Sequence, residues 1–275
     1  MDTTELTPQE RRFESERIHA SPTVLLLAAI GLAFFGVGRL LGSPVIGSTY
    51  SQWGSVLACA GSVVVVIALV LHVDHLSFRI GRSAVVLVIL GAIANGVGNL
   101  LGSLNVSGIN PRWFFGAGWV LAGVGLAMVA VHKEGQMKAT LADYASGAPW
   151  QARVTVHASF LSLITAAIGL ILRGIGDMSQ VIDTGRGPLV LLSVGAVLVA
   201  IGVISHVEHL VPRIGPVAVI AAILAALFWA AGNLPNAIAR SNSANGILLL
   251  CLGVGTLLGA LACALAFQKK ISTDH

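Results

Sequence analysis

Charged side chains are scarce in this sequence. Only 10% of its 275 residues are Asp, Glu, Lys or Arg, whereas 56% are hydrophobic. A soluble domain carries about 25% charged residues and buries its hydrophobic share in one core. Too few polar side chains are present here to cover such a core. The scarcity of charge therefore excludes an ordinary soluble protein and predicts that lipid surrounds much of the chain.

Residues and motifs that carry common chemistry are also scarce. The three cysteines, Cys59, Cys251 and Cys263, lie within hydrophobic runs and show no pairing pattern, which is typical of small packing residues. We find no Gly-x-Ser-x-Gly elbow, Walker-type loop or His-Glu-x-x-His motif. Acidic residues stay at the edges of the runs, whereas ion-coupled pumps usually need carboxylates within the membrane. These absences favour a protein that is not an enzyme.

Eight long hydrophobic runs dominate what is present. They cover residues 22–42, 53–71, 83–103, 113–131, 157–172, 188–205, 216–239 and 246–267. A bilayer core of about 30 Å needs roughly 20 helical residues, whereas strands of a membrane barrel appear as alternating segments of about 10. The runs therefore predict an all-α, polytopic membrane protein with eight transmembrane helices.

Basic residues indicate how these helices are oriented. Of 16 Lys and Arg, 11 lie in the N-terminal arm, the even-numbered connections or the C-terminal tail. Because Lys and Arg accumulate on the cytoplasmic side, both termini are expected there. The excess of 12 Arg over 4 Lys, with abundant Ala, Gly and Val, suggests a GC-rich bacterium and hence the bacterial plasma membrane. The net charge of +4 is thus explained by topology, and no nucleic-acid partner is expected.

An internal duplication organises the chain. His72-Val73-Asp74-His75-Leu76 recurs 134 residues later as His206-Val207-Glu208-His209-Leu210, and the same shift places Arg39 on Arg173 and Asn99 on Asn233. Matches between polar residues are informative in so hydrophobic a chain. Four helices per copy is an even number, so the copies should be parallel and related by a pseudo-two-fold axis along the membrane normal.

The duplication divides the chain into five parts. We expect an N-terminal arm with a short polar helix, a first four-helix repeat, a cytoplasmic linker, a second four-helix repeat and a cytoplasmic tail. Their ranges are 1–21, 22–132, 133–153, 154–268 and 269–275. Within the repeats, glycines four residues apart (38 and 42, 98 and 102, 255 and 259) predict close helix packing, within one chain or in an oligomer.

The repeated histidine motif lies where the second helix of each repeat should reach the cytoplasm. Its candidate functional residues are His72, Asp74, His75, Arg79, His206, Glu208, His209 and Arg213. The simplest interpretation is that they cap helix ends and anchor the chain at the interface. Alternatives are binding of an anionic lipid headgroup or a partner segment, or a metal site formed by His72, His75, His206 and His209. Haem is the weaker cofactor hypothesis, since histidines three residues apart cannot lie on opposite faces of one porphyrin.

A second group comprises Arg39, Asn99, Arg173 and Asn233, placed by the sequence within about a turn of the opposite, non-cytoplasmic face. An arginine in the hydrocarbon region is costly but can extend its guanidinium toward the interface and bond an asparagine. The alternative is a site for an anion or a phospholipid phosphate. Asp177 can neutralise Arg173, whereas no acid accompanies Arg39, so the two positions need not be equivalent.

Three functional hypotheses follow. The sequence favours an accessory or scaffold subunit of a membrane assembly, because no deep polar site is recognisable. A passive transporter for lipids or anions, with its site between the repeats, is the main alternative. A metal- or haem-dependent redox protein is the third, and no cofactor is favoured. Expected partners are membrane lipids and either another membrane protein or a second copy of the chain.

Overall fold

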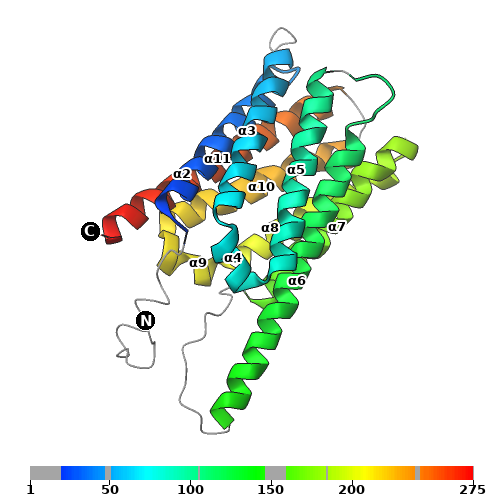
Figure 1. Ribbon diagram of the computed structural model, residues 1–275. Helices are drawn as coiled ribbons and strands as arrows, with labels where there is room; N and C mark the ends of the chain where they lie inside the picture. Colours follow the sequence, from blue (N-terminus) through cyan, green and yellow to red (C-terminus); the bar gives the residue numbers. More distant parts are fainter. Residues whose placement is uncertain are drawn as a thin grey trace.

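The computed structural model describes residues 20–46, 51–104, 106–145, 159–183, 185–238 and 242–274. Within these ranges the chain is helical and contains no strand. The helices are α2 (Pro22–Leu41), α3 (Ser51–Leu71), α4 (Val73–Ile80), α5 (Arg82–Leu104), α6 (Arg112–Ala145), α7 (Phe160–Ile182), α8 (Gly187–Ile204), α9 (Val207–Ile214), α10 (Pro216–Ile238) and α11 (Asn242–Asp274). Helices α4 and α9 are short, and the other eight form the bundle in Figure 1.

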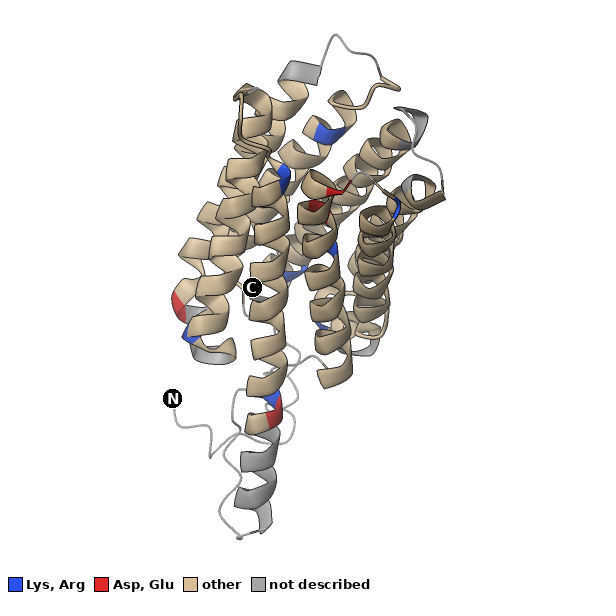
Figure 2. Ribbon diagram, turned by 90° about the vertical axis from the view of Figure 1, so that its right-hand side faces the viewer, with Lys and Arg blue, Asp and Glu red and all other residues tan. Residues whose placement is uncertain are grey.

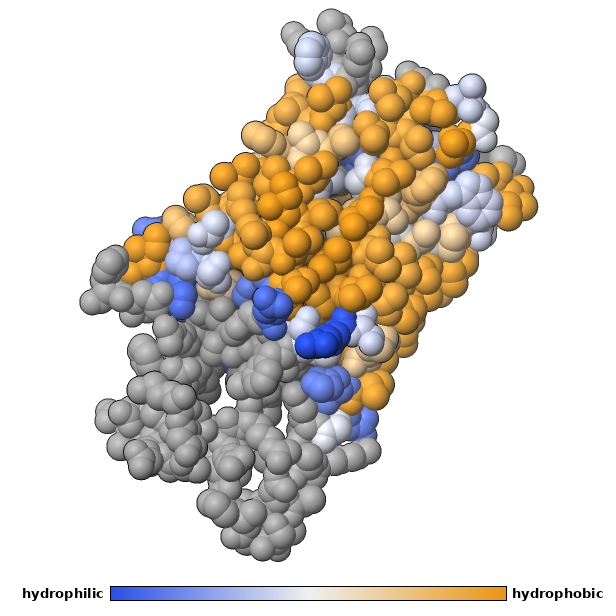
Figure 3. All heavy atoms as spheres, in the orientation of Figure 1, coloured by the Kyte–Doolittle hydropathy of each residue, from blue (hydrophilic) through white to orange (hydrophobic). Residues whose placement is uncertain are grey.

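Those eight helices are each long and hydrophobic enough to cross a membrane, and charged residues are sparse along them (Figure 2). Large hydrophobic side chains lie on their outer surfaces; Leu161 is 70% exposed and Ile182 is 78% exposed. Hydrophobic residues cover most of the middle of the face seen in Figure 3, whereas the hydrophilic residues on that face lie mainly toward its ends. The fold confirms an all-α, multi-pass integral membrane protein whose outer surface contacts lipid.

The expected limits of α2, α3, α5, α8 and α10 agree with the structure to within two residues, whereas α6, α7 and α11 end later than expected. The case of α7 bears on the site. The hydrophobic run ended at residue 172, whereas the helix continues to Ile182. Arg173 and Asp177 broke the run in the sequence, yet both are buried and face other protein groups. Hydrophobicity alone therefore underestimated the length of α7, because a helix that faces a polar interior need not be hydrophobic on every side.

Some expected segments differ or cannot be assessed. The first part of the expected linker, 133–145, continues α6 as a helix, and α11 extends through most of the expected tail to Asp274. Gly135 does not end α6, and Pro235 does not break α10. The short polar helix expected in the N-terminal arm falls in residues 1–19, outside the described residues, as does the rest of the linker.

The eight long helices form a closed ring. In chain order, α2 packs on α3, α3 on α5, α5 on α6, α6 on α7, α7 on α8, α8 on α10 and α10 on α11, while α11 packs back on α2. At one end of the ring, four long helices end and the long helix that follows each of them begins. The four that end there are α2, α5, α7 and α10, and the four that begin there are α3, α6, α8 and α11. We call this end of the ring the Arg112 face, after the first residue of α6. The short helices α4 and α9 lie at the opposite end (Figure 1).

Glycines allow neighbouring helices of the ring to approach closely. A Cβ atom at Gly61 would lie 2.5 Å from the Gly31 carbonyl oxygen across the α2–α3 contact, and one at Gly195 would lie 2.5 Å from the Gly169 oxygen across α7–α8. At Gly38 it would lie 2.5 Å from the Ala58 backbone nitrogen. The small-residue packing expected from the sequence thus occurs within one chain.

The histidine motif forms a break between helices. His72 and His206 each precede a short helix, α4 or α9, and each short helix ends at a glycine, Gly81 with φ of 88° or Gly215 with φ of 86°. Positive φ values of this kind favour glycine. Two similar segments therefore connect α3 to α5 and α8 to α10 with the same sharp turn.

Candidate functional site

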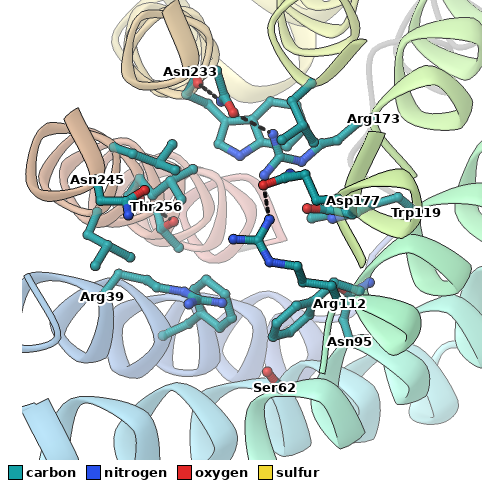
Figure 4. A pocket seen from close by; sticks show the side chains of 18 of the residues that line it. Arg39, Ser62, Asn95, Arg112, Trp119, Arg173, Asp177, Asn233, Asn245 and Thr256 are labelled. Carbon is teal, nitrogen blue, oxygen red and sulfur yellow. Dashed lines mark hydrogen bonds between the residues drawn. The ribbon is translucent and has the colours of Figure 1, made fainter. Parts of the chain in front are cut away.

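The ring encloses a cavity of about 470 Å³, and all eight long helices contribute to its lining. It extends from the middle of the ring, at Leu32 and Thr256, to the Arg112 face, where Arg112 and the exposed Asn245 lie. Three arginines and one aspartate line it: Arg39, Arg112, Arg173 and Asp177. Figure 4 shows these four residues around one space, although they come from α2, α6 and α7.

Arg173 is the deepest of the three arginines and is only 7% exposed. Its Nη1 donates to Asn233 Oδ1 at 2.9 Å, and its guanidinium carbon lies 4.5 Å from the ring centroid of Trp229 and 5.4 Å from that of Trp119. Asn233 is held by its own donation to the Trp229 carbonyl oxygen at 2.7 Å. An amide acceptor and two aromatic faces thus stabilise a cation that is largely shielded from water.

Arg39 has a similar environment on the other side of the cavity. Its Nη2 donates to Asn99 Oδ1 at 2.9 Å, and its guanidinium carbon lies 4.8 Å from the Phe35 ring and 5.7 Å from the Phe115 ring. Asn99 donates in turn to the Asn95 carbonyl oxygen at 2.9 Å. The Arg-to-Asn hydrogen bonds expected from the sequence are therefore present in both halves of the chain.

A smaller cavity of about 170 Å³ adjoins the same arginine. Its lining includes Arg39, Asn99 and three glycines, Gly38, Gly42 and Gly54. Arg39 lines both cavities, so its guanidinium stands between the main cavity and a narrow polar space beside α2 and α3. Arg39 therefore belongs to the lining of two spaces, one inside the ring and one beside α2 and α3.

Asp177 is the single acidic residue among the described lining residues, and it is 9% exposed. Asp177 lies one turn after Arg173 on α7 and shares the cavity with Arg39 and Arg112. Arg112 also donates to Gln180 Oε1, one turn further along α7. With three cations and one anion, the lining carries a formal charge of +2.

The lining also contains more hydrogen-bond donors than it uses. Among the described side chains, three buried nitrogens of the lining residues have no hydrogen-bond partner: Arg39 Nε, Arg173 Nε and Gln180 Nε2. A buried donor left unsatisfied costs about 1–3 kcal/mol. These three nitrogens have almost no accessible surface, so they offer no bond to a ligand in the cavity. The three guanidiniums carry five N–H donors each and donate one side-chain hydrogen bond each, so further donors remain for a ligand that offers acceptors, such as an anion.

The depth of this site corrects the sequence analysis. Arg173 was expected within about a turn of the face, but it lies nine residues before the end of α7, or about 13 Å along the helix axis. The polar side chains therefore reach toward the middle of the membrane. The expectation that no deep polar cluster exists was wrong, because α7 continues through residues that interrupt its hydrophobic pattern.

The structure brings Arg39, Arg173 and Asn233 to one cavity, places Asn99 behind Arg39 in the lining of the smaller cavity, and leaves the histidine motif elsewhere. His72, Asp74, His206 and Arg213 belong to the opposite end of the ring, on or beside α4 and α9. Among the described residues, no group of three or more His, Cys, Asp or Glu side chains could hold a metal ion. The side chains of His75, Arg79, Glu208 and His209 lie outside the described ones, so the metal prediction stays untested.

Several lining residues were not singled out from the sequence: Arg112, Gln180, Trp119 and Trp229. A signal was present on α7, where Arg173, Asp177 and Gln180 are spaced by four and three residues and so share one helix face. A polar stripe on one face of a membrane helix indicates a polar interior. No comparable pattern marks Arg112, which begins α6 after a polar loop.

The fold and the site define an integral membrane protein in which a ring of eight helices encloses a basic cavity. No protein family model matches the sequence, and neither a curated protein nor a solved structure does. Function must therefore be argued from the cavity itself.

Proposed function

We propose that this protein binds an amphipathic anion in the central cavity and acts as a passive, anion-directed transporter. The observation that carries this proposal is the convergence of Arg39, Arg112 and Arg173 on one intramembrane cavity with a single carboxylate, Asp177. Cations inside a membrane are costly unless they are paired or serve a ligand. The excess of arginine is therefore best explained by a negatively charged ligand.

The remaining lining suits the apolar part of such a ligand. Leu32, Val65, Leu192 and Leu252 line the cavity together with the polar residues, and the volume of about 470 Å³ falls within the range of small-molecule sites. Arginine is the preferred residue for carboxylate and phosphate groups because its planar fork can donate two parallel hydrogen bonds. Charge at one part of the cavity and hydrocarbon at another favour an amphiphile over a simple inorganic ion.

We further propose that the ring consists of two parallel four-helix repeats, with the cavity on their pseudo-two-fold axis. Matching glycine contacts support this arrangement. Gly61 contacts Gly31 between α3 and α2, and Gly195 contacts Gly169 in the same way between α8 and α7. Likewise, Gly116 contacts Gly174 between α6 and α7, and Gly253 contacts Gly36 between α11 and α2. Each contact recurs between the corresponding helices of the other half, which is what a rotation about the ring axis requires.

The same contacts change how α2 and α7 are aligned in the proposed repeat. Gly61 and Gly195 are 134 residues apart, but Gly31 and Gly169 are 138 apart, as are the N-caps Ser21 and Ser159. Helix α7 is thus shifted by about one turn relative to α2. In this register Arg39 corresponds to Asp177 and Phe35 to Arg173. The proposed symmetry therefore relates a cation, Arg39, to an anion, Asp177. The two sides of the cavity would then present different charges to the ligand.

The sidedness is part of the proposal. The basic residues of the connections support a cytoplasmic location of both termini, which would turn the Arg112 face, and with it the mouth of the cavity, to the outside of a bacterial plasma membrane. The accessory-subunit hypothesis rested on the lack of a deep polar site. Because the cavity removes that argument, we favour ligand binding and transport.

Substitution of the arginines tests the proposal. In phosphatidylcholine nanodiscs, the protein should bind octyl sulfate saturably, and Arg39→Gln and Arg112→Gln should each weaken binding at least about tenfold, since each removes a charged donor from the cavity. Isothermal titration gives the affinities. Arg186→Gln is the matched control, because Arg186 is exposed at the start of α8 and outside the lining.

Uptake of radiolabelled octyl sulfate into proteoliposomes tests the transport step separately. We expect saturable uptake by the unaltered protein and by Arg186→Gln, and little uptake by Arg39→Gln. Saturable binding without uptake would reduce the proposal to a binding protein. If octyl sulfate binds no better than octanol, or equally well in all variants, the cavity is not an anion site.

A further inference from the structure

We propose that the anion bound in the cavity is a dianion of the phosphomonoester class, attached to an apolar chain. This inference rests on the proposed function, since it names the ligand of the same cavity. Three features of the lining carry it: its net charge, its surplus of donors and the arrangement of its arginines.

The net charge favours two negative charges over one. Among the described lining residues, α2 contributes Arg39, α6 contributes Arg112, and α7 contributes Arg173 and Asp177, whereas α3, α5, α8, α10 and α11 contribute no charged group. The formal sum is +2. A carboxylate or sulfate ester would leave one positive charge uncompensated in a site of low dielectric, which is unfavourable. A phosphomonoester, with a charge of about −2 above its second pKa near 6, neutralises the lining.

The hydrogen-bonding capacity of the wall agrees with such a headgroup. Arg39, Arg112 and Arg173 each donate one side-chain hydrogen bond, to Asn99, Gln180 and Asn233 respectively. A guanidinium carries five N–H donors, so each arginine keeps further donors for a ligand. A phosphomonoester presents three strong acceptor oxygens and no obligatory donor when doubly ionised. A carboxylate presents two, and a headgroup with an ammonium would add donors to a wall already rich in them.

The arginines also surround the headgroup position from different directions. Arg39 and Arg173 are held by Asn99 and Asn233 and backed by aromatic rings, so their guanidiniums are fixed before a ligand arrives. Arg112 approaches from the start of α6 at the mouth. A tetrahedral phosphate can accept from several directions at once, whereas a planar carboxylate accepts in one plane. Preorganised donors of this kind reduce the cost of binding.

Octyl phosphate and octyl sulfate provide the decisive pair of probes. They share chain length and a tetrahedral headgroup, but the sulfate carries one charge at every pH used and the phosphate titrates near pH 6. With the protein in phosphatidylcholine nanodiscs at pH 8, we expect octyl phosphate to bind at least tenfold more tightly than octyl sulfate. This preference should shrink several-fold at pH 5.5. Because octyl sulfate does not titrate, any change in its affinity between the two pH values comes from the protein, for example from Asp177. The ratio of the phosphate and sulfate affinities removes this contribution.

Arg112→Gln lowers the lining charge to +1 and supplies a second test. In this variant the preference for phosphate over sulfate should fall toward unity, while Arg186→Gln keeps the preference of the unaltered protein. Equal affinities for the two probes in the unaltered protein would overturn the dianion inference and leave the anion site intact. If neither probe binds saturably, both the inference and the proposed function are overturned. A preference that is the same at pH 8 and 5.5 would also contradict the dianion.

Discussion

Arg173→Met should lower the free energy of unfolding by about 3 kcal/mol, because loss of one partner of a buried ionic group leaves the others uncompensated. The variant removes the cation that lies one turn before Asp177 on α7, and Asn233 Oδ1 loses its donor. The hydrocarbon of methionine replaces the packing of the arginine stem but none of its polar contacts. Urea-induced unfolding in dodecyl maltoside micelles, followed by circular dichroism, measures the change without relying on the nearby tryptophans and without adding an alkyl sulfate, which belongs to the ligand class proposed for the cavity.

A double substitution separates the ionic interaction from simple loss of packing. If Arg173 and Asp177 are coupled, Arg173→Met with Asp177→Asn should cost at least about 1 kcal/mol less than the sum of the single changes. Arg186→Met, at an exposed position of the same chain, should change stability by no more than about 0.5 kcal/mol. Additive effects of the two cavity substitutions would show that Arg173 does not stabilise the structure through Asp177.

The membrane helices could be predicted from the sequence because hydrophobic length is a local property. Pro22, Leu71 and Pro216 mark helix ends that agree with the limits of the hydrophobic runs. The failure at α7 has a physical cause: the run ended at Leu172, before Arg173, whose cost in lipid is avoided because the side chain faces Asn233 and Trp229 inside the protein. Burial against protein cannot be read from hydropathy alone.

The candidate site could be predicted only in part. Repetition drew attention to Arg39, Arg173 and their asparagines, and each hydrogen bond between them spans 60 residues in the sequence. The cavity depends on closure of the ring, above all on the contact between α11 and α2, which joins the two ends of the chain. No local pattern encodes that contact, so Arg112 could not be assigned to the same site.

The proposed repeats differ in the charges that they would bring to the cavity. In the proposed register, Phe35 and Arg39 of α2 correspond to Arg173 and Asp177 of α7. Two similar helices would then supply different charges to one cavity, and an asymmetric ligand could be held on a nearly symmetric frame. A perfectly repeated site would instead place two equal cations opposite each other, with no carboxylate to balance them.

The close contact between α7 and α8 yields the second large prediction. A Cβ atom at Gly195 would lie 2.5 Å from the Gly169 oxygen and 2.7 Å from the Arg173 backbone nitrogen. Both neighbours are backbone atoms, so the helices must separate to accommodate it. We expect Gly195→Ala to lower the free energy of unfolding by about 2–3 kcal/mol, as overpacking does. Because one of these close contacts is with the backbone of Arg173, the substitution should also displace this arginine in the cavity. The same variant should therefore bind octyl sulfate less tightly.

Gly61→Ala and Gly96→Ala complete this experiment. Gly61 makes the corresponding approach between α2 and α3, where the added Cβ would lie 2.5 Å from the Phe35 backbone nitrogen, so a similar loss of stability is expected. At Gly96 the nearest atom would be Ser62 Cβ at 3.5 Å, an ordinary contact, and alanine should be neutral or stabilising by up to about 1 kcal/mol because it favours the helix. Thermal unfolding of the three variants in one detergent measures the differences. Equal stability of Gly195→Ala and Gly96→Ala would mean that α7 does not lie against α8 at this distance, and the position of Arg173 in the cavity would then be wrong as well.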